Sequence, residues 1–486
     1  MENEKRVYPR DICKLENSGR ATILQYPLFT FLHQHGFYSY RSVDSSLKVY
    51  KVERGIAKIV DKSEIYNFIN DNVFRRKTKT GIPKCDYPRH MELFLRSWTS
   101  IVNDSKMSLL PKMEMKLLRD NKTEGFFFFQ DGVVRVRRGS IMKLDMQEAI
   151  TDGGIILEDK IIPRDITIVS KETAMASDFG LFAIRAVGHE GFPALKKALG
   201  YMMHTFKDKA NAKMVFFSDA NTNFGVANGR TGKSLCSMDA LKQVRNLVVI
   251  DGKQFDTQDR FLLDNVDITT DIICFQDMKQ KFDSNYLYNM ITGELQVGKK
   301  YQNKEVIPFE ISPKLIADSN YGINLLGGSD LARFVVIGFD NYYNEKHQPL
   351  KEFKRRFFDW DTTEWNKFYS FMFYCMQEYL NDGVRDHRLQ ELMTNNIYSR
   401  YDAELIDQLK ENLAVLTVPN DSDTIFNHVT YWGDDSISSH KKLNVVKEIM
   451  RELGYVKMSR RDSLRTKDEK GNYVIIGSMK HWFENK

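Results

Sequence analysis

The segment Ala227–Ser234 (ANGRTGKS) carries the clearest chemistry in the sequence, because it fits the phosphate-loop pattern A/G-x-x-x-x-G-K-S/T. In such a loop, small residues let successive backbone N–H groups point at the phosphates. The lysine reaches the β- and γ-phosphates, and the final hydroxyl binds Mg²⁺. These two roles fall on Lys233 and Ser234. The nucleotide-binding residues expected from the pattern are Ala227, Asn228, Gly229, Arg230, Thr231, Gly232, Lys233, Ser234 and Leu235.

A phosphate loop needs an acidic partner at the end of a neighbouring strand, where a carboxylate holds the Mg²⁺ through water or polarises the attacking water. Asp277 ends the apolar run IICFQD and is the best candidate for this role. Gln276 precedes it, where many such ATPases have a second carboxylate, so the residue that activates water stays open. The expected cofactors are ATP and Mg²⁺, with Ser234 and Asp277 on the metal side.

Two polar residues beside later apolar runs complete the candidate catalytic set of Lys233, Asp277, Asn320 and Arg333. Asn320 follows the run LIADS, and a side-chain amide there can orient the water near the γ-phosphate. Arg333 precedes FVVIGF, a placement suited to an arginine finger offered to the ATP of a neighbouring subunit. Either residue alone would more often be structural, and only the order and spacing of the motifs make them informative.

Between Asp277 and Asn320, two β-like runs surround a polar and basic crest. As a hairpin, this insertion could present cations and one aromatic ring to a single strand of nucleic acid. A solvated surface hairpin is the alternative, but the position inside the ATPase region favours a function. The crest residues expected to bind DNA are Lys299, Lys300, Tyr301 and Lys304.

The C-terminal end of the chain is basic: residues 441–486 hold twelve Lys or Arg against six Asp or Glu. A helix is expected over His440–Leu453, followed by strands over Tyr455–Ser459 and Asn472–Ile476 around a charged turn. A helix followed by a charged β-wing is typical of a winged-helix module. Its expected DNA contacts are Arg460, Arg461 and Arg465, and the alternative is a small basic domain that packs subunits together.

The elements that must position these residues form a parallel α/β sheet, because short apolar runs alternate with helical stretches. The expected strands are Met214–Phe217, Leu247–Ile250, Ile272–Phe275, Lys314–Ala317 and Phe334–Ile337.

The flanking regions mix helices and strands. The Asp-Gly pair in GFFFFQDGVVRVRR predicts a β-hairpin over Gly125–Arg138. The stretch Ser177–Phe206 has helical spacing with a turn expected near residues 188–193, and forms a collar. Helices are expected over Trp360–Leu380 and Asp402–Leu416, and a mixed α+β region over the first 120 or so residues.

The length and composition of the chain limit the number of domains and the classes of protein to which it can belong. At about 100 to 200 residues per domain, a chain of 486 residues predicts roughly two to four domains. Hydrophobic residues are 42% and charged residues 28%, so a disordered chain or a rod is excluded. No apolar run suits a bilayer span or a signal peptide, so we expect no membrane partner and a cytosolic protein. Five scattered cysteines disfavour a zinc site or a disulfide framework.

The order of these motifs resembles superfamily 3 helicases, and within them the helicase part of primase-helicases from phages and mobile elements. The matching strings are NGRTGKS, IICFQDMKQKFD, ITGELQVGKKYQNKEVIPFEISPK, ADSNYG and GSDLARFVVIGFDNYYN, over about residues 212–345.

The resemblance implies an AAA+-like ATPase that assembles as a ring, usually a hexamer, and moves along DNA in the 3′ to 5′ direction. It also implies roles for single residues: Lys233 and Ser234 as the phosphate-loop pair, Asp277 as the metal-side acid, Asn320 as sensor, Arg333 as the finger in trans, and Lys300 as the hairpin lysine, with Lys299 or Lys304 as alternatives. The first 200 residues contain no DxD-type metal motif or zinc ribbon, so priming activity is not expected.

The expected fold class is α/β: an AAA+-like P-loop ATPase core with an α+β N-terminal region, a helical collar and a C-terminal winged-helix-like module. The expected domains are residues 1–120 (N-terminal region), 121–210 (hairpin and collar), 211–345 (ATPase core), 346–425 (helical region) and 426–486 (basic module).

The expected function is an ATP-dependent replicative DNA helicase of a phage or mobile element in a bacterial cytosol. Its partners would be single-stranded and forked DNA, further copies of the chain, and a primase or polymerase. The alternatives are a nucleotide-switched DNA-binding initiator that does not unwind DNA, which the Gln276 position favours, and a replication-protein loader.

Overall fold

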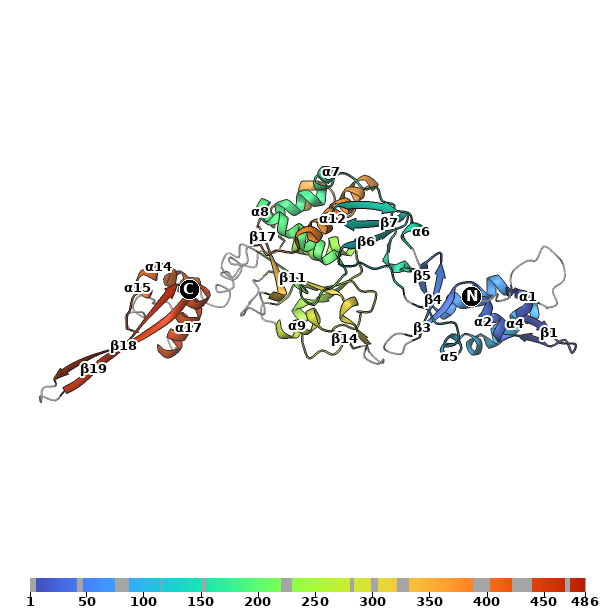
Figure 1. The fold of residues 1–486 in the computed structure, drawn as a ribbon, viewed down its shortest axis with the longest axis horizontal. Helices are drawn as coiled ribbons and strands as arrows, with labels where there is room; N and C mark the ends of the chain where they lie inside the picture. Colours follow the sequence, from blue (N-terminus) through green and yellow to red (C-terminus); the bar gives the residue numbers. More distant parts are fainter. Residues whose placement is uncertain are drawn as a thin grey trace.

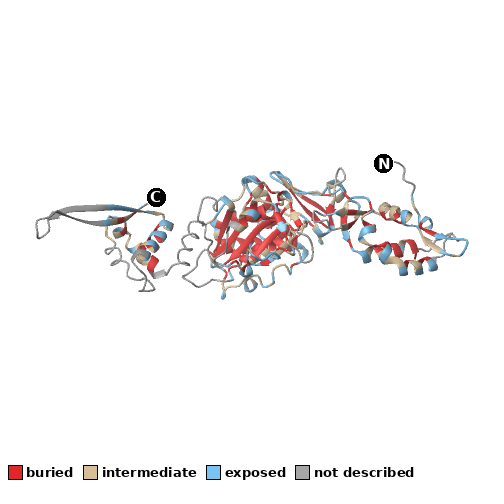
Figure 2. Ribbon diagram, turned by 90° about the horizontal axis from the view of Figure 1, so that it is seen from below, coloured by how far each residue is buried: buried red, intermediate tan, exposed pale blue. Residues whose placement is uncertain are grey.

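The computed structural model describes residues 6–41, 47–74, 87–114, 116–150, 154–219, 230–279, 284–298, 305–320, 332–387, 403–421, 439–467 and 473–485. Figure 1 shows an N-terminal unit, a central unit and a C-terminal unit along the longest axis of the molecule. Figure 2 shows that buried residues are concentrated in the central unit, whose sheet lies between two layers.

The N-terminal unit is the mixed α+β region expected from the sequence. Its helix α3 (Lys62–Ile69) begins at Asp61, whose side chain accepts a hydrogen bond from the backbone N–H of Glu64 at 2.7 Å. One sheet has the order β3-β4-β5-β9. The other elements are α1 (Pro9–Ile12), β1 (Cys13–Leu15), β2 (Ala21–Ile23), α2 (Gln25–Gln34), β3 (Phe37–Arg41), β4 (Leu47–Glu53), β5 (Ile56–Val60), a π-helical turn (Asn70–Phe74), α4 (Tyr87–Ile101), α5 (Asp104–Met107) and β9 (Ile156–Leu157).

A second sheet, of order β10-β6-β7-β8, covers one side of the central unit. The hairpin predicted over Gly125–Arg138 is confirmed: β6 (Glu124–Phe129) and β7 (Gly132–Arg137) pair antiparallel. Phe129 lies opposite Gly132, which leaves a two-residue turn between them. The neighbouring elements are β8 (Ser140–Leu144), α6 (Met146–Ala149), a 3₁₀ turn (Glu158–Lys160), β10 (Ile161–Ile162) and α7 (Lys171–Met175).

Two long helices, α8 (Asp178–Met203) and α12 (Thr362–Asp382), pack together against the central sheet. The turn expected near residues 188–193 is a kink at one residue: Gly188 has φ 71° and ψ 169°, and the helix then continues. A Cβ at Gly188 would lie 2.8 Å from Oδ2 of Asp340, so a larger residue would meet both strain and a close contact. Most aromatic residues of α12 are buried in this core, while Tyr374 and Tyr379 are half-buried.

The central sheet is parallel and has the order β12-β13-β16-β11-β17. All five predicted strands are confirmed, as β11 (Met214–Asp219), β12 (Leu247–Asp251), β13 (Ile272–Gln276), β16 (Lys314–Ser319) and β17 (Phe334–Phe339). Alternate residues of each strand point to opposite faces. In β11, Val215 and Phe217 therefore join the core with α8 and α12, while Met214 and Phe216 join the core on the other face. Burial on both faces explains why β11, β13, β16 and β17 are nearly continuous apolar runs, whereas the edge strand β12 is only partly buried.

Shorter elements surround this sheet. They are a π-helical segment η3 (Leu235–Ala240), a 3₁₀ turn η4 (Gly252–Gln254), α9 (Ser284–Thr292), β14 (Leu295–Val297), β15 (Glu305–Ile307), a 3₁₀ turn η5 (Phe309–Ile311) and α11 (Pro349–Phe353). The helical run expected after the phosphate loop is η3, whose six residues are flanked by α-helical residues on both sides.

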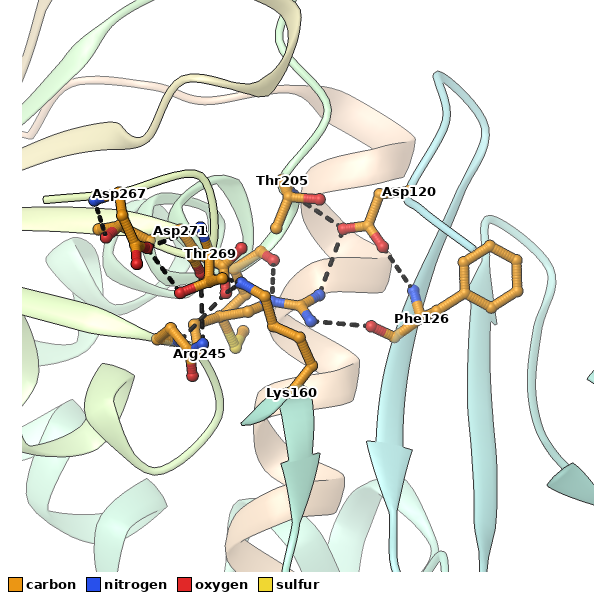
Figure 3. A network of polar contacts seen from close by, with 11 residues as sticks. Asp120, Phe126, Lys160, Thr205, Arg245, Asp267, Thr269 and Asp271 are labelled. Atoms are coloured by element: carbon orange, nitrogen blue, oxygen red, sulfur yellow. Dashed lines mark hydrogen bonds and ion pairs between the residues drawn. The ribbon is translucent and has the colours of Figure 1, made fainter. Parts of the chain in front are cut away.

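A buried ion pair joins the β6 sheet to the central sheet (Figure 3). Arg245 pairs with Asp120 at 3.2 Å, and both side chains are almost fully buried. The guanidinium also donates to the carbonyl oxygens of Met203 at 2.6 Å and Phe126 at 2.9 Å, while the Asp120 carboxylate accepts from the backbone N–H of Thr205 at 2.8 Å. This network holds the end of α8 and strand β6 against the segment that precedes β12.

The C-terminal unit has the helix and the two strands expected of a helix with a β-wing. Its elements are α14 (Ala403–Glu411), α15 (Leu413–Leu416), α17 (Ser439–Glu452), β18 (Tyr455–Lys467) and β19 (Tyr473–Asn485). The strands are much longer than predicted, because they pair antiparallel over their whole length. Helices α14 and α15 share an apolar core with α17 and β19, although the sequence analysis assigned them to the preceding helical region.

Candidate nucleotide-binding site

The carboxyl ends of the central strands meet at one edge of the sheet, and polar residues lie there. β11 ends at Asp219, and β16 ends with Asp318 and Ser319. The strand order reverses beside β11, since the chain leaves β11 for the far edge of the sheet at β12 and returns to its other side only at β17. Open α/β sheets bind ligands at such a reversal, outside the carboxyl ends of the strands.

Residues Arg230–Ser234 form the described part of the phosphate loop, while Ala227, Asn228 and Gly229 lie outside the described residues. Gly232 has φ 94°, and a Cβ there would lie 2.5 Å from the ring of Phe182. Only glycine fits both restrictions. Arg230 also has a positive φ of 74°, and positive φ at alternate residues is the backbone arrangement that turns N–H groups toward a bound anion.

The phosphate-loop lysine is held by a strand-end carboxylate. Lys233 Nζ donates to Oδ1 of Asp219, and the hydroxyl of Thr231 donates to the same oxygen at 2.6 Å. Both partners of the ion pair are nearly inaccessible, with exposed side-chain fractions of 6% and 1%. Burial raises the pKa of the Asp219 carboxyl, and the charge of Lys233 opposes that rise. Asp219 Oδ2 has no hydrogen-bond partner among the described residues.

Asp318 joins the helix after the phosphate loop to the end of β13. Its Oδ2 accepts a hydrogen bond from the hydroxyl of Ser237 at 2.5 Å, and its Oδ1 accepts from the backbone N–H of Asp277 at 2.8 Å. The Asp318 carbonyl accepts from the N–H of Met278, also at 2.8 Å. Asp318 is buried. This carboxylate therefore fixes the position of Asp277 relative to η3.

Asp277, the acidic residue expected to help hold Mg²⁺, follows β13 directly and has a φ of 54°. Its carboxylate is 39% exposed and forms an ion pair with Lys253 at 3.1 Å. Gln276 is the last residue of β13 and is half-buried. A carboxylate held at the strand end but open to solvent can reach a hydrated metal ion, whereas the amide of Gln276 cannot act as a base.

Ser234 and Asn320 lie at the same edge. Ser234 lies one helical turn before Ser237 and is half-buried. Asn320 follows Ser319, which the ladder places opposite Ser218, so Asn320 is level with Asp219 at the end of the neighbouring strand. The structure thus brings four predicted residues, Lys233, Ser234, Asp277 and Asn320, to one edge of one sheet.

Arg333 is not part of this group. It precedes β17 and so lies at the amino edge of the sheet, away from the phosphate loop of its own chain. Its guanidinium carbon lies 4.8 Å from the ring centre of Tyr288 in α9. Arg333 therefore lies too far from the phosphate loop of its own chain to act there. Its predicted role as an arginine finger in the site of a neighbouring chain stays a prediction.

The predicted DNA-binding residues lie on two hairpins. β14 and β15 pair antiparallel, with Leu295 opposite Ile307, so the backbone hairpin expected from the sequence is present. Its crest, with Lys299, Lys300, Tyr301 and Lys304, lies outside the described residues. Arg460 is exposed on β18 in the C-terminal unit. Arg461 and Arg465 belong to the same strand, and their side chains are not described.

The edge suits Mg²⁺-ATP on three grounds. Gly232 leaves room for a close approach, the N–H groups at the start of η3 face the loop, and Lys233 can exchange a carboxylate for a phosphate. ATP would be held by Arg230–Leu235, and Mg²⁺ by Ser234 and Asp277. No group of three or more His, Cys, Asp or Glu side chains suited to a metal ion occurs in the described part of the chain, so a metal here depends on oxygens of the nucleotide and water.

Sequence reasoning missed three residues of this site: Asp219, Ser237 and Lys253. Asp219 was open to the same argument that selected Asp277, since it directly follows an apolar strand. Ser237 and Lys253 carried no comparable signal, because their roles depend on the three-dimensional position of Asp318 and Asp277.

No protein-family profile and no curated protein sequence matches the chain. The A-form apo structure of the NrS-1 C-terminal region is 12% identical and has a TM-score of 0.44, over 94% of this chain and 98% of that one.

Two further structures are similar. The apo structure of residues 305–718 of the NrS-1 C-terminal region is 12% identical with a TM-score of 0.41, over 88% and 86% of the two chains. The JCV helicase, bound to a thiazolopyridine-containing acetamide, is 14% identical with a TM-score of 0.26, over 51% and 62%. At such scores these likenesses carry no argument about function. No helix in the described ranges is long and apolar enough to cross a membrane.

Proposed function

We propose that this chain is an ATP- and Mg²⁺-dependent DNA helicase of replication, of the superfamily 3 type and encoded by a phage or mobile element. The observation that carries the proposal is the buried Lys233–Asp219 pair at the carboxyl edge of a parallel sheet, with Asp277 held beside it by Asp318. A hairpin with a basic crest belongs to the same domain. Together these features supply a nucleotide site and a DNA contact.

Each of the predicted site residues has its own role in this proposal. Lys233 would exchange Asp219 for the β- and γ-phosphates. Ser234 and Asp277 would hold the Mg²⁺, whose charge would neutralise that of the phosphates. Asn320 orients the attacking water. Arg333 acts in the site of the neighbouring subunit of a ring, for which a hexamer is proposed. Closure of each ring interface moves Lys300 and its bound phosphate along the ring axis, so that the ring advances along the strand in the 3′ to 5′ direction.

The remaining parts of the proposal concern partners. Arg460, Arg461 and Arg465 bind duplex or forked DNA through its backbone. A separate primase or polymerase works with the helicase, and the complex acts in the bacterial cytosol.

The test is steady-state ATP hydrolysis with and without single-stranded DNA. The proposal expects Lys233→Ala to abolish turnover and Lys300→Ala to retain basal turnover but lose stimulation by DNA. Lys116→Ala, which removes an exposed lysine outside both sites, is the matched control and should behave as wild type. DNA-independent turnover in the wild type, or a Lys300→Ala variant that is stimulated normally, would contradict a DNA-coupled motor.

A nucleotide-switched initiator is the second candidate, and the surroundings of Asp277 favour it. Gln276 replaces the expected second carboxylate, and Lys253 partly neutralises Asp277. Rings that assemble on ATP binding with negligible hydrolysis, measured by sedimentation together with phosphate release, would favour this candidate over the helicase.

A further inference from the structure

A basic cavity lies at the amino edge of the central sheet, away from the phosphate loop. Its volume is about 330 Å³, and it lies between the segment after α8, the end of α12 and the turn after β7. Four Lys or Arg side chains and one carboxylate line it; the cations are Lys122, Arg138, Lys207 and Lys213, and the carboxylate is Asp208. The volume is at the lower end of the range for small-molecule sites.

The single carboxylate does not neutralise these cations. Asp208 accepts hydrogen bonds from the backbone N–H of Ala210 at 3.0 Å and the side chain of Asn211 at 3.2 Å, and so closes its own turn. Arg138 donates one N–H to the carbonyl of Leu380 at 2.9 Å near the end of α12. Lys213 donates to the carbonyl of Ala332 at 2.7 Å. These are neutral partners, so the positive charge persists.

Lys207 is the most important residue of the wall, because it is buried and its hydrogen-bond partners are neutral, although the charge of Glu310 acts on it. Its Nζ donates to the hydroxyl of Ser312 at 2.7 Å and lies 4.7 Å from the ring centre of Phe309. Behind the cavity, Lys314 is buried as well, with its Nζ on the carbonyl of Tyr201 at 2.8 Å. Burial of both ammonium groups is costly, since Glu310 and Asp120 oppose it only through their charge and burial still lowers both pKa values; a bound anion lowers that cost.

Aromatic rings line the same cavity. Tyr379 and Phe206 are half-buried and contribute to its wall, next to the buried Tyr201. Tyr201 and Tyr379 pack edge to face at 5.5 Å. Cations beside accessible aromatic surface are the combination that binds phosphates together with bases.

We propose that this cavity binds the phosphate groups of a nucleotide, with its base or sugar against Tyr379, at a site separate from the phosphate loop. The nucleotide is either free in solution or part of a single DNA strand, since both present the same chemistry. Burial lowers the pKa of Lys207 to about 8, and burial with repulsion from Lys207 lowers that of Lys314 further below its usual range. The negative charge of a bound phosphate raises both pKa values, because it favours the protonated amines.

The test uses the full chain with Asp219→Asn and Lys233→Met, which removes the phosphate-loop lysine without leaving its carboxylate unpaired. Two probes are titrated separately: ATP by calorimetry, and a fluorescein-labelled thymidine oligonucleotide by anisotropy. In this background, Lys207→Met should weaken binding of at least one probe by about tenfold or more, since a charge-assisted hydrogen bond is lost. Lys122→Ala, at the exposed rim, should weaken it several-fold.

Lys209→Ala is the matched control, because this exposed lysine belongs to the same segment but does not line the cavity. Lys209→Ala should bind both probes with a dissociation constant within about twofold of that of the Asp219→Asn/Lys233→Met background. An effect of Lys207→Met on ATP alone identifies a free nucleotide, and an effect on the oligonucleotide identifies DNA. The proposal is overturned if neither probe binds the background protein, or if Lys207→Met and Lys122→Ala bind both probes as tightly as Lys209→Ala.

Discussion

Replacing Asp219 with asparagine tests the arrangement of the nucleotide site directly. The substitution keeps the shape of the side chain but removes the charge that faces Lys233 in the buried pair. Removing one partner of a buried ion pair costs about 3–5 kcal/mol, because the other charge stays buried and unpaired. We therefore expect Asp219→Asn to lower the free energy of unfolding of the nucleotide-free central unit by that amount.

ATP should offset this loss in the variant. In the wild type, Lys233 must leave Asp219 before it can bind a phosphate, so the ion pair competes with the nucleotide. In Asp219→Asn no such competitor exists, and the phosphates supply the missing negative charge. The thermal shift caused by saturating ATP should therefore be larger in the variant than in the wild type, even though the nucleotide-free variant melts earlier.

A double-mutant cycle distinguishes this pair from a general packing effect. Lys233→Met alone should destabilise the nucleotide-free protein, since Asp219 is then left unpaired. The combination with Asp219→Asn should restore most of the loss, which gives a coupling energy of about 3 kcal/mol in urea unfolding. Two outcomes would refute the reasoning: losses of unfolding free energy that simply add in the double variant, or a change in the unfolding free energy of Asp219→Asn below about 0.5 kcal/mol.

Three further predictions concern the central unit. Arg245→Met should lower the free energy of unfolding by about 3–5 kcal/mol in urea titrations, since it leaves a buried carboxylate unpaired. Gly232→Ala should abolish ATP binding at the phosphate loop in calorimetry through its contact with Phe182, while Gly139→Ala, which meets no neighbouring atom, should keep that binding. Burial lowers the pKa of His204 from 6.5 to about 4, so the unfolded chain binds the proton first as pH falls. Stability should drop by about 3 kcal/mol from pH 6.5 to 4, and less in His204→Gln, as measured by urea unfolding at each pH.

The parallel sheet could be predicted from the sequence because its strands are buried on both faces. Each strand is a short, nearly continuous apolar run, and the runs are separated by segments long enough to cross over. Asp277 was found for a related reason: it is a charged residue directly after such a run. The strand order was not predicted, because it depends on which strands pair, and apolar composition does not encode that.

The contacts that fix the site could not be read from the sequence. Asp318 bridges Ser237 and Asp277, which are far apart in the chain and meet only because β13 and β16 are neighbours. The length of β18 was underestimated because its half from Arg460 to Lys467 is charged and lacks apolar alternation. In β19 the half nearer the helices, Gly477–Asn485, was missed, and pairing with β18 extends both strands. In both cases long-range pairing outweighs the local pattern.

Two of the buried lysines of the central unit, Lys233 and Lys207, should respond oppositely to loss of charge. Lys233 has a carboxylate partner inside the chain, whereas among the described residues Lys207 has only neutral ones. Replacing Lys207 with methionine removes a buried ammonium whose burial outweighs the attraction of Glu310, and the hydroxyl of Ser312 keeps its bond to the Phe309 carbonyl at 3.0 Å.

Lys207→Met should therefore leave the free energy of unfolding unchanged or raise it by about 1–2 kcal/mol without ligand, while Lys233→Met lowers it. Urea unfolding of both variants in phosphate-free buffer measures the difference. If Lys207→Met lowered the free energy of unfolding as much as Lys233→Met does, the charge of Lys207 would already be stabilised by groups of the fold. No anion would then be needed at the amino edge of the sheet.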